Sequence, residues 1–408
     1  MTAISHAPVA VRRYGWVPGE IPDDLVLGAP QTGGTYERAL LLLERDGVPW
    51  GRVGVAAAGG IVRGASVERA AALQIAGEPW ASTSAPGQEG PALPLRVVIT
   101  SCQDPWRAVR SVGALLREPD PNLEVVVVER RREASTLLRV LTETFPEEPR
   151  LTWRDEPRPG RADARNRGAQ GAAGGLIAFL DDDALVHPYW VAAMREAMRG
   201  TGADAIGVGL GSTIPLALET EAQWLWFRAS AAGGRPGASS GLDRPMPWEP
   251  SGAGAFESGI CLSVSALQEL GGFDGRLGSG TPSQGGDDVD VVLRARRAGY
   301  AVVQVPRAVV WREYPDALPS IERAAFARGV GVSATMTKQL VAGPGTAGRV
   351  QAASTVMRLG HHSRLRPPSD LAPDSGSPRR LIVMERLGLA AGPLAYARSA
   401  LRGRGAPQ

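Results

Sequence analysis

The sequence predicts an α/β protein in which helices cover both faces of a mostly parallel β-sheet. Between residues 95 and 180, short apolar runs alternate with segments of helical spacing, as expected of strand–helix–strand units. The chain has 408 residues, enough for two or three domains and a large core. Its apolar fraction of 43% is typical of a globular protein rather than a disordered one. We therefore expect a central sheet domain with smaller regions on either side.

Residues 1–94 predict a small accessory region that contains β-structure. Apolar runs lie on both sides of Asp46-Gly47, a dipeptide typical of a hairpin turn. Ser66 is a candidate N-cap for the helix expected after it. The stretch 81–94 is rich in Ser, Pro and Gly, which predicts a linker to the next region.

From residue 95 onward the sequence alternates between strand and helix patterns. The predicted strands are 96–100, 123–128, 151–153 and 176–180, and the predicted helices are 106–116, 136–145 and 162–173. The strand candidates are apolar and several are rich in Val, which favours β-structure. Asp104-Pro105 is a typical helix start, with Pro at the first helical position. Connections between such parallel strands should be right-handed.

Beyond residue 207 the pattern weakens. Residues 207–250 are predicted to form loops with one helix over 219–229. The remaining predicted elements are helices over 265–270, 287–298 and 322–340 and a strand over 301–305. Gly329 and Gly331 are expected to interrupt the last helix. Residues 366–379 are rich in Pro, Ser and Asp, which is typical of a mobile segment.

Three carboxylates, Asp181, Asp182 and Asp183, directly follow the apolar run that ends at Leu180. At the carboxyl end of a strand, they would face the crevice where open α/β sheets bind ligands. Neighbouring carboxylates repel one another unless a cation or hydrogen bonds stabilise them, and Mg²⁺ and Mn²⁺ prefer oxygen ligands. The alternative is a helix N-cap cluster, where acidic side chains suit the helix dipole.

Two other charged clusters and one loop are candidates for a site. Arg165 and Asn166 could bind a phosphate or orient a ribose, or they could belong to an exposed charged helix face. Asp287 and Asp288 follow two glycines, where a carboxylate could act as a general base or simply suit a helix N-terminus. The Gly-rich stretch 271–282 could approach a ligand, fold tightly or form a plain surface loop.

Five stretches between residues 95 and 315 occur in a specific order. They read RVVITS, LEVVVVE, GRADARNRGAQGAAGGLIAFLDDD, SALQELGGFDGRLGSGTPSQGGDDVDVVLRARRAGY and PRAVVW. In these stretches the chain resembles glycosyltransferase family 2, a GT-A group of nucleotide-sugar-dependent transferases. The resemblance implies a GT-A-type, Rossmann-like domain over 95–316, preceded by the accessory region 1–94. A helical C-terminal extension would cover 317–408.

The resemblance also implies a reaction, in which a sugar moves from a nucleotide-diphosphate donor to an acceptor hydroxyl. The acidic (DxD) motif would hold Mg²⁺ or Mn²⁺ through Asp183 together with Asp181, with Asp181 nearer the ribose and Asp182 between them. The cation would neutralise charge on the departing diphosphate. Asp288, with Asp287 beside it, would supply the catalytic base. One displacement would invert the anomeric configuration.

Three more residues are implied to lie near the nucleotide, namely Ser101, Glu129 and Arg165, although the family often has Asp where Glu129 stands. Arg312 occupies the position of a common metal-holding His, and a guanidinium has no lone pair for a cation. Three explanations stay open. Glu313 could act as the ligand, the Arg312 charge could itself offset the diphosphate, or the chain could be an inactive relative.

Two other functions stay open beside the transferase. A nucleotidyltransferase shares acidic metal chemistry, but it would usually carry a Gly-rich basic loop after the first strand, which residues 101–105 lack. A catalytically inactive nucleotide-sugar-binding or scaffold protein would keep the fold without turnover. The net charge of +3, without a Lys/Arg run, argues against a nucleic-acid partner. The acceptor could be a saccharide, a lipid-linked molecule or a natural product.

The sequence also predicts where the protein is located. No signal-peptide pattern and no apolar run long enough to span a bilayer is visible, so a cytoplasmic protein is expected. Residues 381–401 mix apolar residues with Arg386 and Arg398. This segment could lie at the inner face of an anionic membrane, near lipid-linked acceptors, or pack as an ordinary C-terminal helix.

Overall fold

The computed structural model describes residues 7–17, 19–75, 92–101, 104–117, 119–130, 136–199, 206–229, 246–247, 259–342 and 379–403. Most of the predicted linker, the segment 366–378 and most of the stretch from 230 to 250 lie outside the described residues, so the predictions made for them stay predictions.

A nine-stranded sheet forms the centre of the protein. Its strands are β6 (Leu95–Ser101), β7 (Leu123–Glu129), β8 (Leu151–Asp155), β9 (Leu176–Asp181), β10 (Ala184–Val186), β11 (Ile206–Pro215), β12 (Met246–Pro247), β13 (Ile260–Ser263) and β14 (Ala301–Arg312). They are ordered β10-β14-β11-β13-β9-β6-β7-β8, and β12 also pairs with β14. The pairings leave only β10, β12 and β13 antiparallel to the rest, so a mostly parallel sheet is confirmed.

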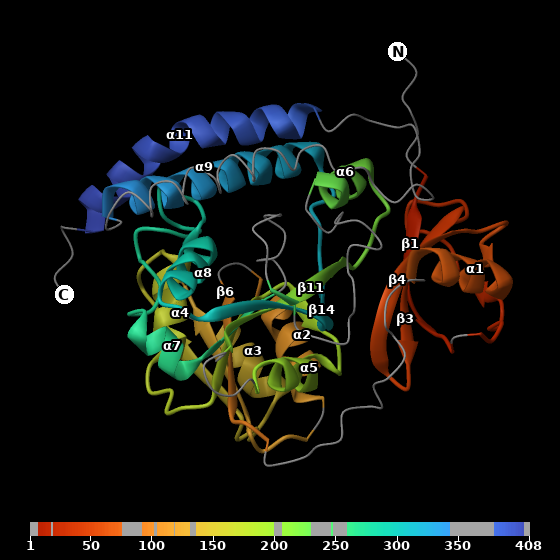
Figure 1. Ribbon diagram of the computed structural model, residues 1–408, viewed down its shortest axis with the longest axis horizontal. Coiled ribbons are helices and arrows are strands. Elements are labelled where there is room, and N and C mark those ends of the chain that lie inside the picture. The colour runs from red at the N-terminus through yellow and green to blue at the C-terminus, as the bar shows by residue number, and fades with distance from the viewer. Residues whose placement is uncertain are drawn as a thin grey trace.

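Helices cover both faces of this sheet, as the alternation of elements predicts (Figure 1). They are α2 (Pro105–Leu116), α3 (Thr136–Thr144), α4 (Arg161–Ala169), α5 (Trp190–Ala197), α6 (Glu221–Ala229), α7 (Val264–Glu269) and α8 (Asp287–Arg297). Val97 and Ile99 on β6 pack with α2, α3 and α5, whereas Val98 packs with α4, α7 and α8. Because successive strand residues point to opposite faces, one apolar strand contributes to two cores.

The N-terminal region contains a second, three-stranded sheet with the order β1-β3-β4. Its elements are β1 (Val9–Gly15), β2 (Leu25–Val26), β3 (Arg38–Arg45), β4 (Val48–Ala56), β5 (Ile61–Val62) and α1 (Gly64–Ile75). The predicted hairpin is confirmed, because Asp46 and Gly47 adopt φ of 53° and 76°, as a tight primed turn requires. The N-cap prediction for Ser66 is wrong, because the helix begins two residues earlier and Asp24 accepts from the Gly64 N–H.

A buried charge cluster joins this small sheet to the large one. His187 is fully buried, and its Nε2 lies 2.9 Å from Glu44 Oε1. Arg13 Nε donates to the same carboxylate at 2.6 Å. Burial alone would raise the pKa of Glu44, but the hydrogen bonds from His187 and Arg13 outweigh burial and lower the pKa to about 2. His187 therefore has a structural role, in the contact between the two sheets.

Glu44→Gln is expected to lower the free energy of unfolding by about 2 kcal/mol at pH 7, because a hydrogen-bonded charge is lost. The folded-state pKa of Glu44 is depressed, so its stabilisation is complete above about pH 4.5 and is lost as the pH falls toward 2. Thermal midpoints should thus differ at pH 7 and converge near pH 2. Glu37→Gln is the matched control, because Glu37 is exposed and lies directly before β3, the strand that carries Glu44. An equal loss of stability in this variant would contradict the stabilising role of Glu44.

The prediction that residues 207–250 form only loops and one helix is wrong for 207–215, which belong to β11, and for 246–247, which form β12. Glycines obscure the strand pattern in the sequence. A Cβ on Gly207 would lie 2.6 Å from the Tyr300 side chain, and a Cβ on Gly209 would lie 3.1 Å from Met198 Sδ. The side chains of Tyr300 and Met198 therefore occupy the space that strand side chains would normally take. Because the strand has glycines at these positions, its sequence lacks the alternation of apolar and polar residues that would reveal it. The short strand β13 was also not predicted.

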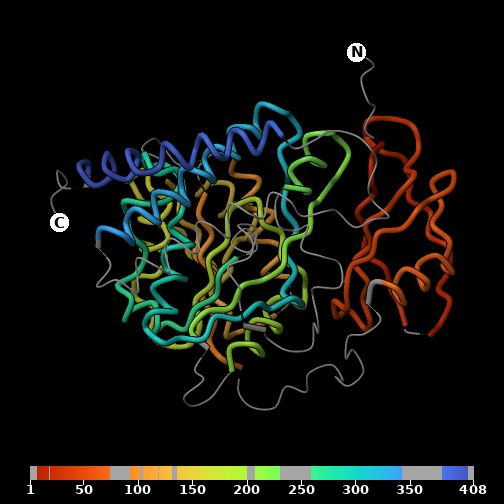
Figure 2. The backbone as a smooth tube through the Cα atoms, turned by 45° about the horizontal axis from the view of Figure 1, so that its top comes forward, coloured from red at the N-terminus to blue at the C-terminus, as the bar shows by residue number. Residues whose placement is uncertain are grey.

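Two long helices, α9 (Leu318–Ala342) and α11 (Arg379–Gly403), lie side by side across one end of the large sheet (Figures 1 and 2). The predicted interruption of α9 is wrong, since the helix continues through Gly329. A Cβ on Gly329 would lie 2.1 Å from the Glu385 carbonyl oxygen, and one on Gly388 would lie 2.1 Å from that of Phe326. These glycines allow two backbones to touch. No helix in the described part of the chain is long and apolar enough to cross a bilayer.

Candidate active site

The three predicted carboxylates lie at the carboxyl edge of the large sheet. Asp181 ends β9, and Asp182 and Asp183 form the turn into β10. The N-cap alternative is wrong, because the next helix, α5, begins only at Trp190. The register pairs Thr100 of β6 with Asp181, so the ends of neighbouring parallel strands meet here. This is the edge at which open α/β sheets bind ligands.

Two of the residues implied to contact the nucleoside lie at the same edge. Ser101 and Glu129 are paired in register at the ends of β6 and β7. Ser101 Oγ donates to Asp182 Oδ2 at 2.8 Å, and Trp153 Nε1 donates to Glu129 Oε2 at 3.2 Å. Their contact with a nucleoside stays a prediction.

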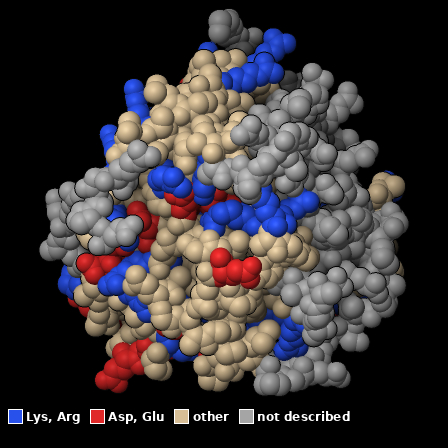
Figure 3. Space-filling view, turned by 60° about the vertical axis from the view of Figure 1, so that its left-hand side comes forward, with Lys and Arg blue, Asp and Glu red and all other residues tan. Residues whose placement is uncertain are grey.

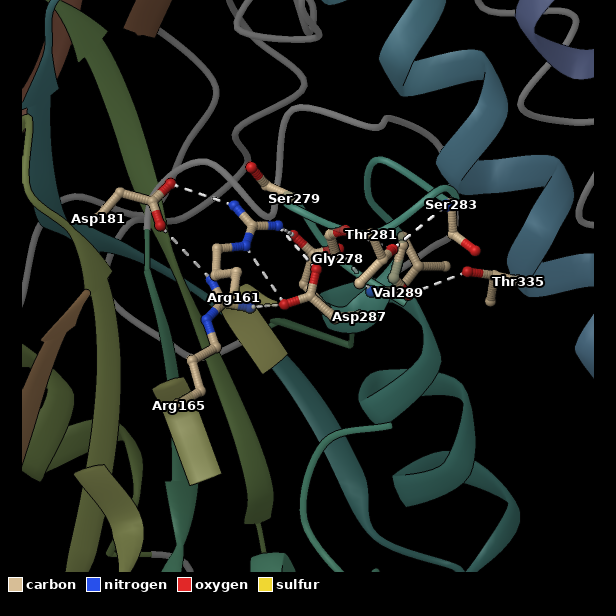
Figure 4. Close-up of polar contacts among 12 residues, drawn as sticks. Arg161, Arg165, Asp181, Gly278, Ser279, Thr281, Ser283, Asp287, Val289 and Thr335 are labelled. Carbon is tan, nitrogen blue, oxygen red and sulfur yellow. Dashed lines mark hydrogen bonds and ion pairs between the residues drawn. The ribbon is translucent and has the colours of Figure 1, made fainter. Parts of the chain in front are cut away.

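Two arginines on α4 bind the carboxylates of two different segments (Figure 4). Arg161 Nη2 lies 2.8 Å from Asp287 Oδ1, and its Nη1 lies 3.4 Å from Asp181 Oδ2. Arg165 Nη1 lies 2.7 Å from Asp287 Oδ2. Only 2% of Arg165 is exposed, so the alternative of an exposed helix face is wrong for it. The sequence analysis missed Arg161, although spacing of four residues places it on the face of Arg165.

The Gly-rich stretch 271–282 folds tightly against the start of α4. A Cβ on Gly280 would lie 1.8 Å from the Pro159 carbonyl oxygen, and the Arg161 N–H donates to the Ser279 carbonyl at 2.8 Å. Asn166 exchanges two hydrogen bonds of 2.8 Å with the backbone of Phe273. Asn166 therefore positions this loop instead of facing a phosphate.

The adjacent carboxylates at the start of α8 have opposite environments. Asp287 is fully buried, and although burial would raise its pKa, Arg161 and Arg165 lower it. Asp288 borders a cavity, and its pKa is raised by burial and by the charge of Asp287. Asp287 is therefore an ionised anchor for two arginines, whereas Asp288 has the higher proton affinity that suits a base.

Arg312, the last residue of β14, lies between Asp181 and Asp183. Its Nη1 is 3.2 Å from Asp181 Oδ2, and its Nη2 is 2.8 Å from Asp183 Oδ1. Burial would raise the pKa of Asp181, but Arg161 and Arg312 lower it, whereas burial raises the pKa of Asp183. The guanidinium thus occupies the space between the two carboxylates that were predicted to hold a cation.

Arg312 stands where a divalent cation would have to bind. The two predicted ligands, Asp181 and Asp183, share its single positive charge, while the buried oxygen Asp181 Oδ1 accepts no hydrogen bond within the described residues. Glu313, the suggested replacement ligand, instead lies 2.8 Å from Arg107 and 2.6 Å from Arg110 on α2. Within the described ranges, no group of three His, Cys, Asp or Glu side chains could hold a metal ion. Because Mg²⁺ is commonly held by one or two carboxylates together with phosphate oxygens, the pairing of both carboxylates with Arg312, and not their number, is what opposes a cation here.

A cavity of about 350 Å³ connects these charged groups to α9. Its lining includes the charged residues Arg161, Asp181, Asp183, Asp288 and Arg312, with Trp226 and Tyr314 beside them, and Ala324, Ala327, Arg328, Gly331 and Val332 of α9. One side is therefore polar, and the helical side is mostly apolar, as in many small-molecule sites. Acidic and basic side chains also lie intermixed across the middle of the face in Figure 3.

One polar network near this cavity was not predicted. Lys338 on α9 lies 2.7 Å from Asp274 Oδ2 and 2.8 Å from Asp290 Oδ1. Asp290 is fully buried on α8, where Arg294 also pairs with it at 2.8 Å. The network ties the helix that carries Asp288 to α9, and no motif in the sequence indicates it.

Comparison with known families gives a match within the large sheet. Residues 97–229 match the family described as Glycosyl transferase family 2. Over these residues the chain is similar to the family 2 glycosyltransferases. The matched region extends from β6 to α6, so it contains the three carboxylates of the turn but neither Asp288 nor Arg312. The resemblance predicted from the sequence is confirmed, and the family identifies a transferase enzyme.

Three solved structures resemble this chain distantly. A mannosyltransferase from Pyrobaculum calidifontis in complex with GDP-Man and Mn²⁺ is 16% identical, with 77% of this chain and 87% of that chain covered and a TM-score of 0.46. GalNAc-T7 with UDP, GalNAc and Mn²⁺ is 16% identical, with 65% and 55% covered and a TM-score of 0.43. TarS 1-349 from S. aureus is 13% identical, with 76% and 91% covered and a TM-score of 0.43.

Similarities this weak say nothing about which ligands this chain binds. None of the curated proteins matches the sequence.

Proposed function

We propose that this glycosyltransferase moves a sugar from a nucleotide-diphosphate donor to an acceptor hydroxyl, with inversion at the anomeric carbon. The observation that carries the proposal is the position of Asp288. Its carboxylate borders the same cavity as Asp181, Asp183 and the cationic side chains of Arg161 and Arg312. A base and the groups that would face a diphosphate thus share one space of about 350 Å³.

The proposed reaction is a single displacement. Asp288 accepts the proton of the acceptor hydroxyl, and the hydroxyl oxygen forms a bond to the anomeric carbon. The bond from that carbon to the diphosphate oxygen breaks, and its electron pair leaves with the nucleotide diphosphate. Arg161 lies within the same cavity and can offset the developing charge. Asp287 holds Arg161 and Arg165 in position through ion pairs of 2.8 and 2.7 Å.

The other predicted site residues are proposed to contact the nucleotide-sugar donor. Ser101, Glu129, Asp182 and Arg165 would contact the nucleotide, because they lie at the strand ends or just behind the cavity wall. Asp181 and Asp183 were predicted to hold Mg²⁺ or Mn²⁺, and their pairing with Arg312 disagrees with that role.

The first experiment is a thermal-shift screen with UDP, GDP, dTDP and their sugars. A nucleotide present at about 100 times its dissociation constant stabilises the protein by roughly 2.7 kcal/mol, a shift that is readily measured. Stabilisation followed by nucleotide release with an acceptor supports the transferase. Stabilisation without transfer or hydrolysis across many acceptors would favour an inactive nucleotide-sugar-binding protein, and pyrophosphate release from a nucleoside triphosphate would favour a nucleotidyltransferase.

We also propose that the outer face of α11 contacts an anionic membrane surface. Val383, Leu387, Leu394 and Leu401 are 50%, 52%, 58% and 70% exposed, and their spacing places them on one helix face. The helix carries five arginines but one glutamate, and Glu385 is already paired with Arg328. Arg386 and Arg398 flank the apolar stripe on opposite sides. Apolar side chains bordered by cations suit the headgroup region of anionic lipids.

Replacing Leu387 and Leu394 together by Ser should abolish most binding to phosphatidylglycerol vesicles, because the buried apolar area is lost. Co-sedimentation with vesicles measures this binding. Leu73→Ser on α1 is the matched control, since Leu73 is 76% exposed but lies on another helix. Unchanged sedimentation of the double variant, or equal binding of the unmodified protein to phosphatidylcholine vesicles, would contradict the proposal.

A further inference from the structure

We infer that Arg312 binds the donor diphosphate in the place of a divalent cation, so that donor binding and transfer need no metal. The inference rests on the proposed nucleotide-diphosphate donor and adds the chemical means of holding it. It starts from the guanidinium between Asp181 and Asp183, with contacts of 3.2 and 2.8 Å.

The position of Arg312 is set by the backbone and not only by a long side chain. Strand β14 pairs antiparallel with β10, and the register places Arg312 opposite Ala184, the residue that follows Asp183. Leu216 N–H also donates to the Arg312 carbonyl at 2.8 Å. Only 16% of the Arg312 side chain is exposed. The backbone of Arg312 is therefore held at this edge, and its mostly buried guanidinium lies beside the two carboxylates.

A divalent cation would compete with this arginine for Asp181 Oδ2 and for both oxygens of Asp183. Binding the cation at these atoms would require the carboxylates to leave Arg312, and it would put two positive centres next to each other. Arg161, whose Nη1 lies 3.4 Å from the same Asp181 Oδ2, adds a further positive charge. Glu313 cannot add a ligand without leaving Arg107 and Arg110. The site is therefore already supplied with positive charge.

A guanidinium can bind a diphosphate through hydrogen bonds, which is the role that the cation would otherwise have. Arginine presents several N–H donors in a planar arrangement that matches two phosphate oxygens, and it stays protonated at any physiological pH. When Arg312 turns to a diphosphate, Asp181 keeps Arg161 at 3.4 Å and Arg165 at 3.7 Å as partners. The carboxylate is not left as an uncompensated buried charge. The same guanidinium then offsets the negative charge on the leaving diphosphate.

The experiment compares the unmodified protein with Arg312→His in the thermal-shift screen, in EDTA and in Mn²⁺. The unmodified protein is expected to show the same nucleotide-dependent shift in both conditions, and its turnover should change less than about twofold. Imidazole offers a lone pair beside two carboxylates, so Arg312→His should lose the shift in EDTA and regain it in Mn²⁺. Arg107→His is the matched control, because Arg107 pairs with Glu313 at 2.8 Å but does not itself line the cavity.

Each outcome bears on the inference. A shift of the unmodified protein that requires Mn²⁺ would overturn it, whether or not the Arg312→His variant folds. Equal shifts in EDTA for the unmodified protein and Arg312→His would also overturn it, because the arginine would then contribute nothing to donor binding. No shift with any nucleotide would overturn the proposed function, and this inference with it.

Discussion

Asp288→Asn is expected to lower kcat by about 10²–10⁴-fold, the usual contribution of a general base. An amide has nearly the shape of a carboxylate but cannot accept the acceptor's proton, so nucleotide binding should remain. The thermal midpoint should change little, because the substitution removes the repulsion from buried Asp287 but also the 3.5 Å ion pair with Arg161. Transfer assays and nucleotide thermal shifts on the same preparation measure the two effects separately.

Asp155→Asn is the matched control for this substitution. Asp155 ends β8 at the same edge of the sheet, but it is exposed and does not line the cavity. The unmodified protein should also lose activity as the pH falls through the raised pKa of Asp288, at higher pH than an ordinary aspartate would dictate. Retention of most activity in Asp288→Asn would remove this residue from the role of base.

Asp287→Ala is expected to destabilise the protein by about 3–5 kcal/mol, the usual effect of removing one partner from a buried ion pair. Asp287 is fully buried, and both Arg161 and Arg165 lie within 2.8 Å of its oxygens. Without it, two buried guanidiniums face each other with fewer counter-charges. Denaturant unfolding at neutral pH measures the loss.

The control for this change is Asp163→Ala, which removes a carboxylate of α4 that pairs with a more exposed arginine, Arg158, at 3.0 Å. Its effect should be no more than about 1 kcal/mol, as expected of exposed ion pairs. Equal losses in the two variants would mean that Asp287 contributes no more than a surface charge, and its assignment as the anchor of Arg161 would fail.

The sequence predicted the elements whose signal is local. The strands β6, β7 and β9 are apolar runs buried on both faces. At the start of α2, the Asp104 side chain accepts a hydrogen bond from the Trp106 N–H, and Pro105 is the first helical residue. The strand β11 could not be predicted, because it contains glycines where strand side chains would normally stand. The space beside these glycines is occupied by the side chains of Tyr300 and Met198, which belong to other elements. Long-range packing decides such cases and leaves no periodic pattern.

The residues of the candidate site likewise differ in whether a local motif indicates them. Asp181, Asp183, Asp288 and Arg312 belong to motifs and were singled out from the sequence, and the structure brings them to one cavity. The spacing of four residues between Arg161 and Arg165 indicates that both lie on one face of α4, but Arg161 was not among the predicted site residues. The α9 wall of the cavity could not be predicted, because the helix reaches it only through tertiary packing.

The contact of α9 with α11 has a consequence for when the site forms during synthesis. Gly331 of α9 packs against Gly286, directly before the two aspartates of α8, and Thr335 Oγ1 donates to the Gly286 carbonyl at 3.0 Å. In turn, α9 touches the backbone of α11 along its glycines. Domains form from the N-terminus as the ribosome proceeds. The sheet can therefore fold before α11 is synthesised, whereas α9, which lines the pocket beside Asp288, gains its packing partner only when α11 has left the ribosome.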